Sequence, residues 1–87
     1  MKKIRLFFFE SCPYCRKAIG WLEELMAENP EYAKIEIERI DEKLNPEIAD
    51  QFDYYYVPTF FVGDEKLHEG AATKDKVRAV LESALKD

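Results

Sequence analysis

Cys12 and Cys15 are the residues whose type and spacing point most directly to chemistry. They are the only cysteines of the chain, and Pro13 and Tyr14 separate them. Two thiols at this spacing can alternate between a dithiol and a disulfide, which is what thiol–disulfide exchange requires. The pair follows the apolar run LFFF at 6–9 and precedes a stretch with helical periodicity. We therefore expect it where a strand hands over to a helix.

A cysteine at the start of a helix is well placed to ionise. Unsatisfied backbone N–H groups and the positive end of the helix dipole both favour the thiolate of Cys12. Pro13 suits the first turn, where its missing N–H costs nothing, and Arg16 and Lys17 add positive charge, so we assign these three residues to tuning the thiol. Cys15 lies one turn deeper. We expect Cys12 to attack a substrate disulfide and Cys15 to resolve the mixed disulfide.

Other kinds of thiol site stay open on the residues alone. Half of a zinc site would need Asp or Glu as its remaining ligands, because His68 is the only histidine. A metal or iron–sulfur cluster shared by two chains would use four thiolates and make the protein a binding module. A structural disulfide is the third alternative. Our expectation is a redox dithiol with no metal site and no bound cofactor.

Length and composition restrict the class of protein. The 87 residues predict one domain over 1–87, and 47% hydrophobic with 36% charged residues indicates a globular chain rather than a disordered one. With 18 acidic and 13 basic residues the net charge is −5. That charge argues against non-specific nucleic-acid binding and against an anionic membrane surface.

The amino terminus does not fit a secretory signal. Its basic start is followed by an apolar run that ends at Glu10, shorter than the roughly 7–15 residues such signals use. No segment approaches the ~20 apolar residues of a membrane helix. We expect a cytoplasmic monomer with no membrane contact. Because that compartment is reducing, a paired CxxC is more often catalytic or metal-binding than structural there.

Hydrophobic periodicity predicts seven elements. Strands are expected at 3–9, 34–40, 59–62 and 66–69, with Gly63-Asp64 as the turn between the last two. One helix is expected from Cys12 to Asn29-Pro30, and a short one after Asn45-Pro46 that carries Leu44, Ile48 and Phe52 on one face. A final helix is expected after Thr73 as its cap.

The order β-α-β-α-β-β-α predicts an α/β fold. A strand–helix–strand start implies a parallel pair, and the later hairpin adds antiparallel strands. The expected result is a four-stranded mixed sheet with helices on both faces.

With these elements in order, the chain resembles the glutaredoxins and the small glutaredoxin-like thioredoxins. The motif CPYC at 12–15, the Val57-Pro58 step and the closing hairpin and helix carry the resemblance, which covers essentially the whole chain. It implies the thioredoxin fold and a cis peptide bond before Pro58. The pattern alone would favour an ordinary trans proline at the start of a strand.

The same resemblance implies which residues meet the substrate. The backbone of Val57, beside Pro58, is expected to pair with an extended substrate chain, and Tyr14 is expected to contact it. For Tyr54, Tyr55 and Tyr56 two interpretations stay open, namely an aromatic-lined groove for a peptide or glutathione, or half-exposed packing.

The activity implied is dithiol–disulfide oxidoreduction, acting on disulfide-containing proteins or small disulfides. Glutathione is a candidate co-substrate and electron donor, and a flavin-dependent thioredoxin reductase is the alternative. The family patterns are incomplete on both sides. Phe9 replaces the glutaredoxin lysine, Tyr56 replaces its threonine and Thr73 its acid, whereas Leu6 replaces the buried aspartate of thioredoxins.

Overall fold

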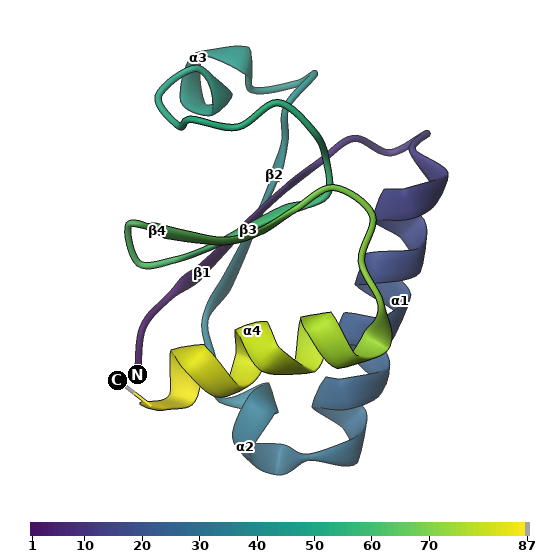
Figure 1. Ribbon diagram of the computed structural model, residues 1–87, viewed down its shortest axis with the longest axis vertical. Coiled ribbons are helices and arrows are strands. Elements are labelled where there is room, and N and C mark those ends of the chain that lie inside the picture. The colour runs from purple at the N-terminus through teal and green to yellow at the C-terminus, as the bar shows by residue number, and fades with distance from the viewer. Residues whose placement is uncertain (87) are drawn as a thin grey trace.

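The first strand is one of the two central strands of the sheet, and both of its faces are apolar. In the computed structural model, which describes residues 1–86, β1 (Ile4–Phe8) buries Ile4 and Leu6 on one face and Phe7 on the other. It pairs in parallel with β2 (Ile37–Asp41) and antiparallel with β3 (Thr59–Val62). β4 (Glu65–Glu69) pairs antiparallel with β3, which gives the order β2-β1-β3-β4 (Figure 1). The predicted four-stranded mixed sheet is confirmed.

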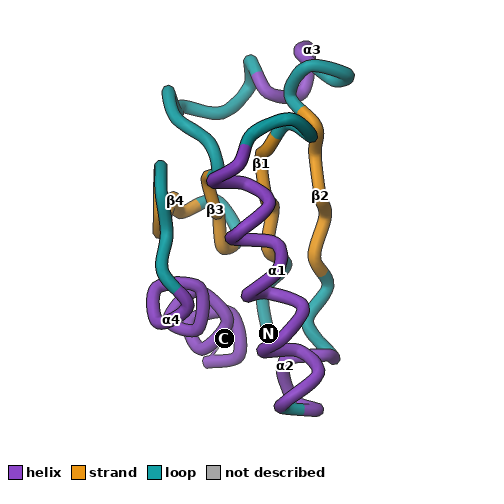
Figure 2. Tube along the Cα trace, turned by 90° about the vertical axis from the view of Figure 1, so that its right-hand side faces the viewer, coloured by secondary structure: helices purple, strands orange, loops and turns teal. Residues whose placement is uncertain are grey.

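The larger core lies between the sheet and three helices. These helices are α1 (Pro13–Glu28), α2 (Pro30–Ala33) and α4 (Lys74–Lys86), and Figure 2 shows α1 lying along the sheet with α4 beside it. Apolar residues recur on α1 at spacings of three and four, so they form one buried stripe. The buried side chains from the strands and helices form one continuous cluster, which includes Ile4, Leu6, Leu22, Leu25, Phe60, Val77 and Leu81.

The opposite face of the sheet is covered by α3 (Pro46–Ala49) and the segment that follows it. Phe7 is at the centre of this smaller core, where its ring centroid lies 4.9 Å from that of Phe52 and 4.8 Å from that of Tyr54. Phe61 completes the cluster of rings, in an edge-on contact with Phe7 at 5.7 Å. Helices therefore cover both faces, as predicted, although α3 is a single turn.

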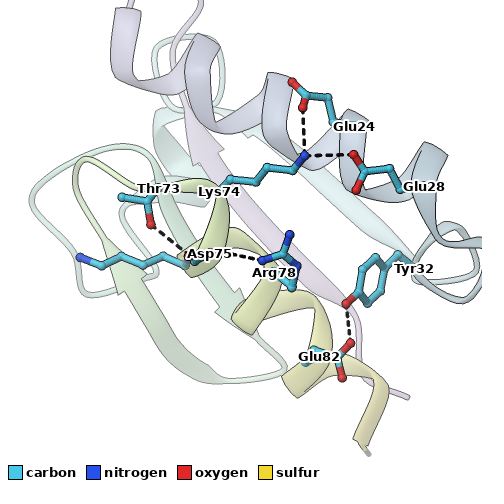
Figure 3. Close-up of polar contacts among 9 residues, drawn as sticks. Glu24, Glu28, Tyr32, Thr73, Lys74, Asp75, Arg78 and Glu82 are labelled. Atoms are coloured by element: carbon cyan, nitrogen blue, oxygen red, sulfur yellow. Dashed lines mark hydrogen bonds and ion pairs between the residues drawn. The ribbon is translucent and has the colours of Figure 1, made fainter.

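Polar contacts tie the last helix to the first two (Figure 3). The Nζ atom of Lys74 lies 3.1 Å from a carboxylate oxygen of Glu24 and 3.0 Å from one of Glu28, both on α1. The hydroxyl of Tyr32, on α2, donates a hydrogen bond to Glu82 of α4. These contacts lie at the edge of the larger core and fix α4 across α1.

The structure corrects the prediction around Asn29 and Pro30. Asn29 ends α1 as expected, but its side chain also accepts a hydrogen bond from the backbone N–H of Glu31 at 3.0 Å and so starts α2, which was not predicted. The backbone N–H of Ile35 donates to the carbonyl of Tyr32, so Ile35 still belongs to this turn. For that reason the second strand begins at Ile37, and the predicted start at residue 34 is wrong.

The expectation for Leu44 is also wrong. α3 begins at Pro46 and ends at Ala49, so Leu44 precedes it and is 77% exposed, while Phe52 packs from the loop beyond. The hairpin turn is confirmed at Gly63, whose φ of 60° is a left-handed conformation that glycine adopts without strain. Thr73 caps α4 as predicted, since its hydroxyl accepts the backbone N–H of Lys76 at 3.2 Å. Within residues 1–86 no helix has both the length and the apolar character needed to span a bilayer.

The two leucines Leu22 and Leu44 give a matched test of this packing. Leu22 is fully buried between α1 and the sheet, so Leu22→Ala should lower the free energy of unfolding by about 2–5 kcal/mol. Leu44→Ala, at an exposed position, should change it by no more than about 0.5 kcal/mol. Urea unfolding followed by circular dichroism measures both. Equal losses for the two variants would contradict the arrangement.

Candidate dithiol site

The strand register brings four connecting segments to one end of the sheet. Phe8 at the end of β1 is in register with Asp41 at the end of the parallel strand β2. Phe7 is in register with Thr59, the first residue of β3, and Thr59 with Glu69, the last residue of β4. The chain segments that leave or enter the sheet at these residues therefore meet at the same edge, at the top of the sheet in Figure 1. These segments and the first turns of α1 (Pro13–Glu28) hold every residue predicted for the site.

Cys12 is the N-cap residue of α1. Its φ and ψ are −79° and 116°, and its Sγ atom accepts a hydrogen bond from the backbone N–H of Cys15 at 3.4 Å. Its own N–H donates to the carbonyl of Phe9 at 3.1 Å, which closes a tight turn after β1. Both cysteines are free thiols, with Cys12 5% exposed and Cys15 1% exposed. The predicted position at a strand-to-helix junction is confirmed.

The two thiols differ in chemical environment. Burial, followed by a side-chain hydrogen bond to Cys12, raises the pKa of Cys15 from 9.0 to about 12. A backbone hydrogen bond from Phe9 opposes the shift, and the negative charge of Glu42 adds to it. Cys15 is therefore a protonated thiol at neutral pH. The backbone N–H and the thiol of Cys15 are both hydrogen-bonded to Cys12, which is the slightly more exposed of the two cysteines.

The residues predicted to tune the thiol of Cys12, namely Pro13, Arg16 and Lys17, lie on the first turns of α1. Pro13 occupies the first position of α1, as expected. Arg16 is exposed, and its Nε atom donates to the backbone carbonyl of Glu10 at 3.2 Å rather than to a cysteine sulfur. Lys17 is exposed on the same helix. Arg16 and Lys17 therefore contribute positive charge at this end of α1. The hydrogen bond of Arg16 goes to a backbone carbonyl and not to a cysteine.

The peptide bond between Val57 and Pro58 is cis, which confirms the expectation drawn from the family resemblance. Pro58 is buried, and its carbonyl accepts the backbone N–H of Gly70 at 2.9 Å. The hydroxyl of Thr59 donates to the carbonyl of Tyr56. The residues before β3 are thus held by two hydrogen bonds. One comes from Thr59 of β3, and the other comes from Gly70, which follows β4.

The three consecutive tyrosines divide between core and surface. Tyr54 packs its ring on Phe7, and its hydroxyl donates to Glu42 at 2.8 Å. Tyr55 and Tyr56 are 85% and 70% exposed, and Tyr14 is 56% exposed. Tyr54 therefore fits the interpretation of half-exposed packing. Tyr55 and Tyr56 stand exposed at the dithiol end, and for them an aromatic-lined groove stays a prediction.

Glu42 is a site residue that the sequence did not reveal, and it is the hydrogen-bond partner of Tyr54. The backbone N–H of Glu42 donates to the carbonyl of Phe8 at 2.8 Å, which places Glu42 beside the turn that carries the dithiol. Burial and the hydrogen bond to Glu42 raise the pKa of Tyr54, so its hydroxyl stays a donor. No motif links Glu42 to the cysteines, so only the pairing of β1 with β2 could have found it.

Two of the positions that depart from the glutaredoxin pattern have other partners here. The Nζ atom of Lys43 lies 4.1 Å from the ring centroid of Phe9 in a cation–π contact. Thr73 serves as the cap of α4.

An open pocket of about 330 Å³ is lined by Glu42, Lys43, Pro46, Ala49, Asp50, Phe52, Tyr54 and Tyr55. Within residues 1–86 no group of three or more His, Cys, Asp or Glu side chains is arranged to hold a metal ion.

A cis-proline, a mixed four-stranded sheet and a CxxC pair at the start of a helix define a class of redox proteins with the thioredoxin fold. The sequence profile of the thioredoxin domain matches residues 2–82. A thioredoxin from Methanocaldococcus jannaschii is 31% identical over 83 residues, which cover 95% of each chain. The chain belongs to the thioredoxin domain family.

Solved structures agree with this assignment. A thioredoxin-like protein from Clostridium perfringens, itself described as uncharacterised, superposes with a TM-score of 0.71 at 26% identity, over 100% of this chain and 74% of that one. Oxidised thioredoxin from Plasmodium falciparum superposes with a TM-score of 0.70 at 20% identity, over 92% and 77% of the two chains, and shows the fold alone. The family and the nearby cysteine pair together suggest a thiol–disulfide oxidoreductase.

The difference between the thiols predicts the order of alkylation. At pH 7 the remaining thiol of Cys15→Ser should react with iodoacetamide at least about tenfold faster than that of Cys12→Ser. Because burial, the largest cause of the raised pKa of Cys15, remains in Cys12→Ser, the reaction of Cys15 in that variant should keep accelerating above pH 9. Mass spectrometry of quenched samples gives both rates. Rapid labelling of Cys15 at neutral pH would exclude this environment.

Proposed function

We propose that this protein reduces disulfide bonds in other proteins, using Cys12 as the nucleophile and Cys15 as the resolving thiol. The observation that carries the proposal is the asymmetry of the pair. Both thiols are buried, but Cys12 caps α1 and accepts the N–H of Cys15, whereas Cys15 holds its proton, with a pKa of about 12. Of the two sulfurs, that of Cys12 is therefore the one suited to begin an attack at neutral pH.

The reaction proceeds in two exchanges. The Cys12 thiolate attacks one sulfur of the substrate disulfide, so that the substrate S–S bond breaks, a mixed disulfide forms and the other substrate sulfur leaves as a thiolate. That thiolate is the base that removes the proton of Cys15. Cys15 then attacks the Cys12 sulfur, which forms the Cys12–Cys15 disulfide and releases the second substrate sulfur. Two electrons pass to the substrate, and a donor must return two to the protein.

A flavin-dependent thioredoxin reductase is the donor we propose. Two observations support this donor. The chain is similar to a thioredoxin along 95% of its length, and the hydroxyl of Thr73 is used to cap α4. In the glutaredoxin pattern the place of Thr73 holds an acid that binds the amino group of glutathione, and a capping hydroxyl cannot supply that charge.

Glutathione is the second candidate, and Lys43 is the observation in its favour. CPYC is a glutaredoxin motif, and the glutaredoxin lysine that meets a glutathione carboxylate is replaced by Phe9. The ammonium of Lys43 lies over the Phe9 ring, so a positive charge stands beside that place from another segment. It also lines the pocket of about 330 Å³, a volume at the lower end of those that hold small ligands.

Cysteine variants test the roles of the two thiols. Cys12→Ser should lower reduction of insulin disulfides by about a thousandfold or more, because no other thiol can start the reaction. Cys15→Ser should accumulate a mixed disulfide, seen as an adduct in intact-mass spectrometry. Full activity in Cys12→Ser would show that the assignment is wrong.

Turnover with two donor systems decides between the candidates. Insulin reduction should be supported by NADPH with thioredoxin reductase and should be at least about tenfold slower with NADPH, glutathione and glutathione reductase. Lys43→Met should leave the faster reaction unchanged, with Lys86→Met on the far helix as its control. A higher rate with glutathione, together with a raised KM for glutathione in Lys43→Met, would instead identify a glutaredoxin.

A further inference from the structure

The segment before the cis-proline is held by one carboxylate. An Oε2 atom of Glu69, the last residue of β4, accepts the backbone N–H of Tyr55 and that of Tyr56, the latter at 2.9 Å. The other oxygen of Glu69 lies 2.8 Å from the Nζ atom of Lys66, which also donates to the carbonyl of Asp53 at 3.1 Å. Two residues of β4 thus fix three backbone positions of the segment 53–56.

Glu69 is held in its charged form by these contacts. The hydrogen bond from Lys66, followed by those from the backbone of Tyr55 and Tyr56, lowers the pKa of Glu69 to about 2. The folded-state pKa is depressed, so the clamp is complete above the ordinary pKa of a glutamate and is lost as pH falls toward 2. Both carboxylate oxygens are engaged, so this acid is not free to bind the amino group of a ligand.

The clamped backbone displays its side chains outward. Among the described residues, four of the five exposed large hydrophobic side chains lie in segments at the dithiol end of the sheet, namely Tyr14, Leu44, Tyr55 and Tyr56, and only Met1 lies elsewhere. Exposed apolar side chains grouped in this way mark an interaction surface. Two of the four, Tyr55 and Tyr56, are the residues whose N–H groups Glu69 holds.

Val57, the residue after Tyr56, has backbone groups without a hydrogen-bond partner among residues 1–86. Tyr56 is fixed by Glu69 on its N–H side and by Thr59 on its carbonyl, and Pro58 by Gly70. Between them, no hydrogen bond within residues 1–86 uses the backbone N–H or carbonyl of Val57. A rigid, half-exposed residue with both backbone groups free can pair with an extended peptide, as an additional strand does.

We propose that Glu69 is a positioning residue for polypeptide substrates, an inference that rests on the function proposed above. By fixing the backbone of Tyr55 and Tyr56, it holds the two rings and the free backbone of Val57 in the arrangement that an extended, apolar segment around a substrate disulfide can meet. Preorganisation of this kind lowers the entropic cost of binding. A small disulfide without a peptide backbone gains nothing from it.

The test compares two disulfides in single turnover. Pre-reduced wild-type protein and Glu69→Gln are mixed with an excess of either a synthetic ten-residue peptide disulfide with apolar flanks or bis(2-hydroxyethyl) disulfide, and the second-order rate constants are measured by acid quenching and mass spectrometry. Gln keeps the shape of the side chain but loses the charge. We expect the variant to be about tenfold slower with the peptide and within about twofold of wild type with the small disulfide.

Matched variants keep the result interpretable. Glu65→Gln, at the exposed start of β4, should leave both rate constants unchanged. If Glu69→Gln does not fold, Lys66→Met is used in its place and should slow only the peptide reaction, by about threefold. Equal slowing with both disulfides, or no slowing with either, would overturn the role of Glu69.

Failure of the proposed oxidoreductase function would give a different result in this experiment from failure of the positioning role of Glu69. Because the protein is reduced beforehand with dithiothreitol, the result does not depend on the natural donor. If the wild type reduced neither disulfide, the oxidoreductase function would fail. If the wild type reduced both and Glu69→Gln kept the wild-type preference for the peptide, only the positioning role would fail.

Discussion

The pairing of β1 with a strand on each side is the constraint on which the site depends. Phe8 stands beside Asp41 in the parallel pair, and Phe7 beside Thr59 in the antiparallel pair. A shift of one residue in either register would turn Phe7 from the smaller core to the larger one. It would also separate the turn that carries Cys12 from the segment that carries Pro58. The chemistry of the thiols thus depends on the packing of a buried phenylalanine that itself takes no part in the reaction.

The dithiol and its helix could be predicted because their determinants are local. A cap, a first-turn proline and an apolar stripe lie within one continuous stretch, and β3 is a short apolar run ended by Gly63. Prediction failed where one residue serves two elements. Asn29 ends α1 and starts α2, and the turn that follows delays β2 to Ile37.

The surroundings of the thiols could not be read in the same way. Glu42 meets Tyr54, and Glu69 meets the backbone of Tyr55 and Tyr56, across gaps in sequence that only the sheet closes. The contact between Glu69 and a backbone N–H leaves no trace in residue type at all, since any residue except proline offers that donor. A motif therefore identifies the reacting atoms, and the tertiary structure identifies what holds them.

The buried proton of Cys15 links the oxidation state of this protein to its stability. The pKa of this thiol rises from 9.0 to about 12 in the fold, so below pH 9 folded and unfolded chains bind the proton equally. As pH rises from 9 toward 12, the unfolded chain releases that proton first and unfolding becomes easier. The disulfide form has no such proton to lose. Alkaline conditions therefore weaken the reduced protein more than the oxidised one, which becomes the more resistant of the two.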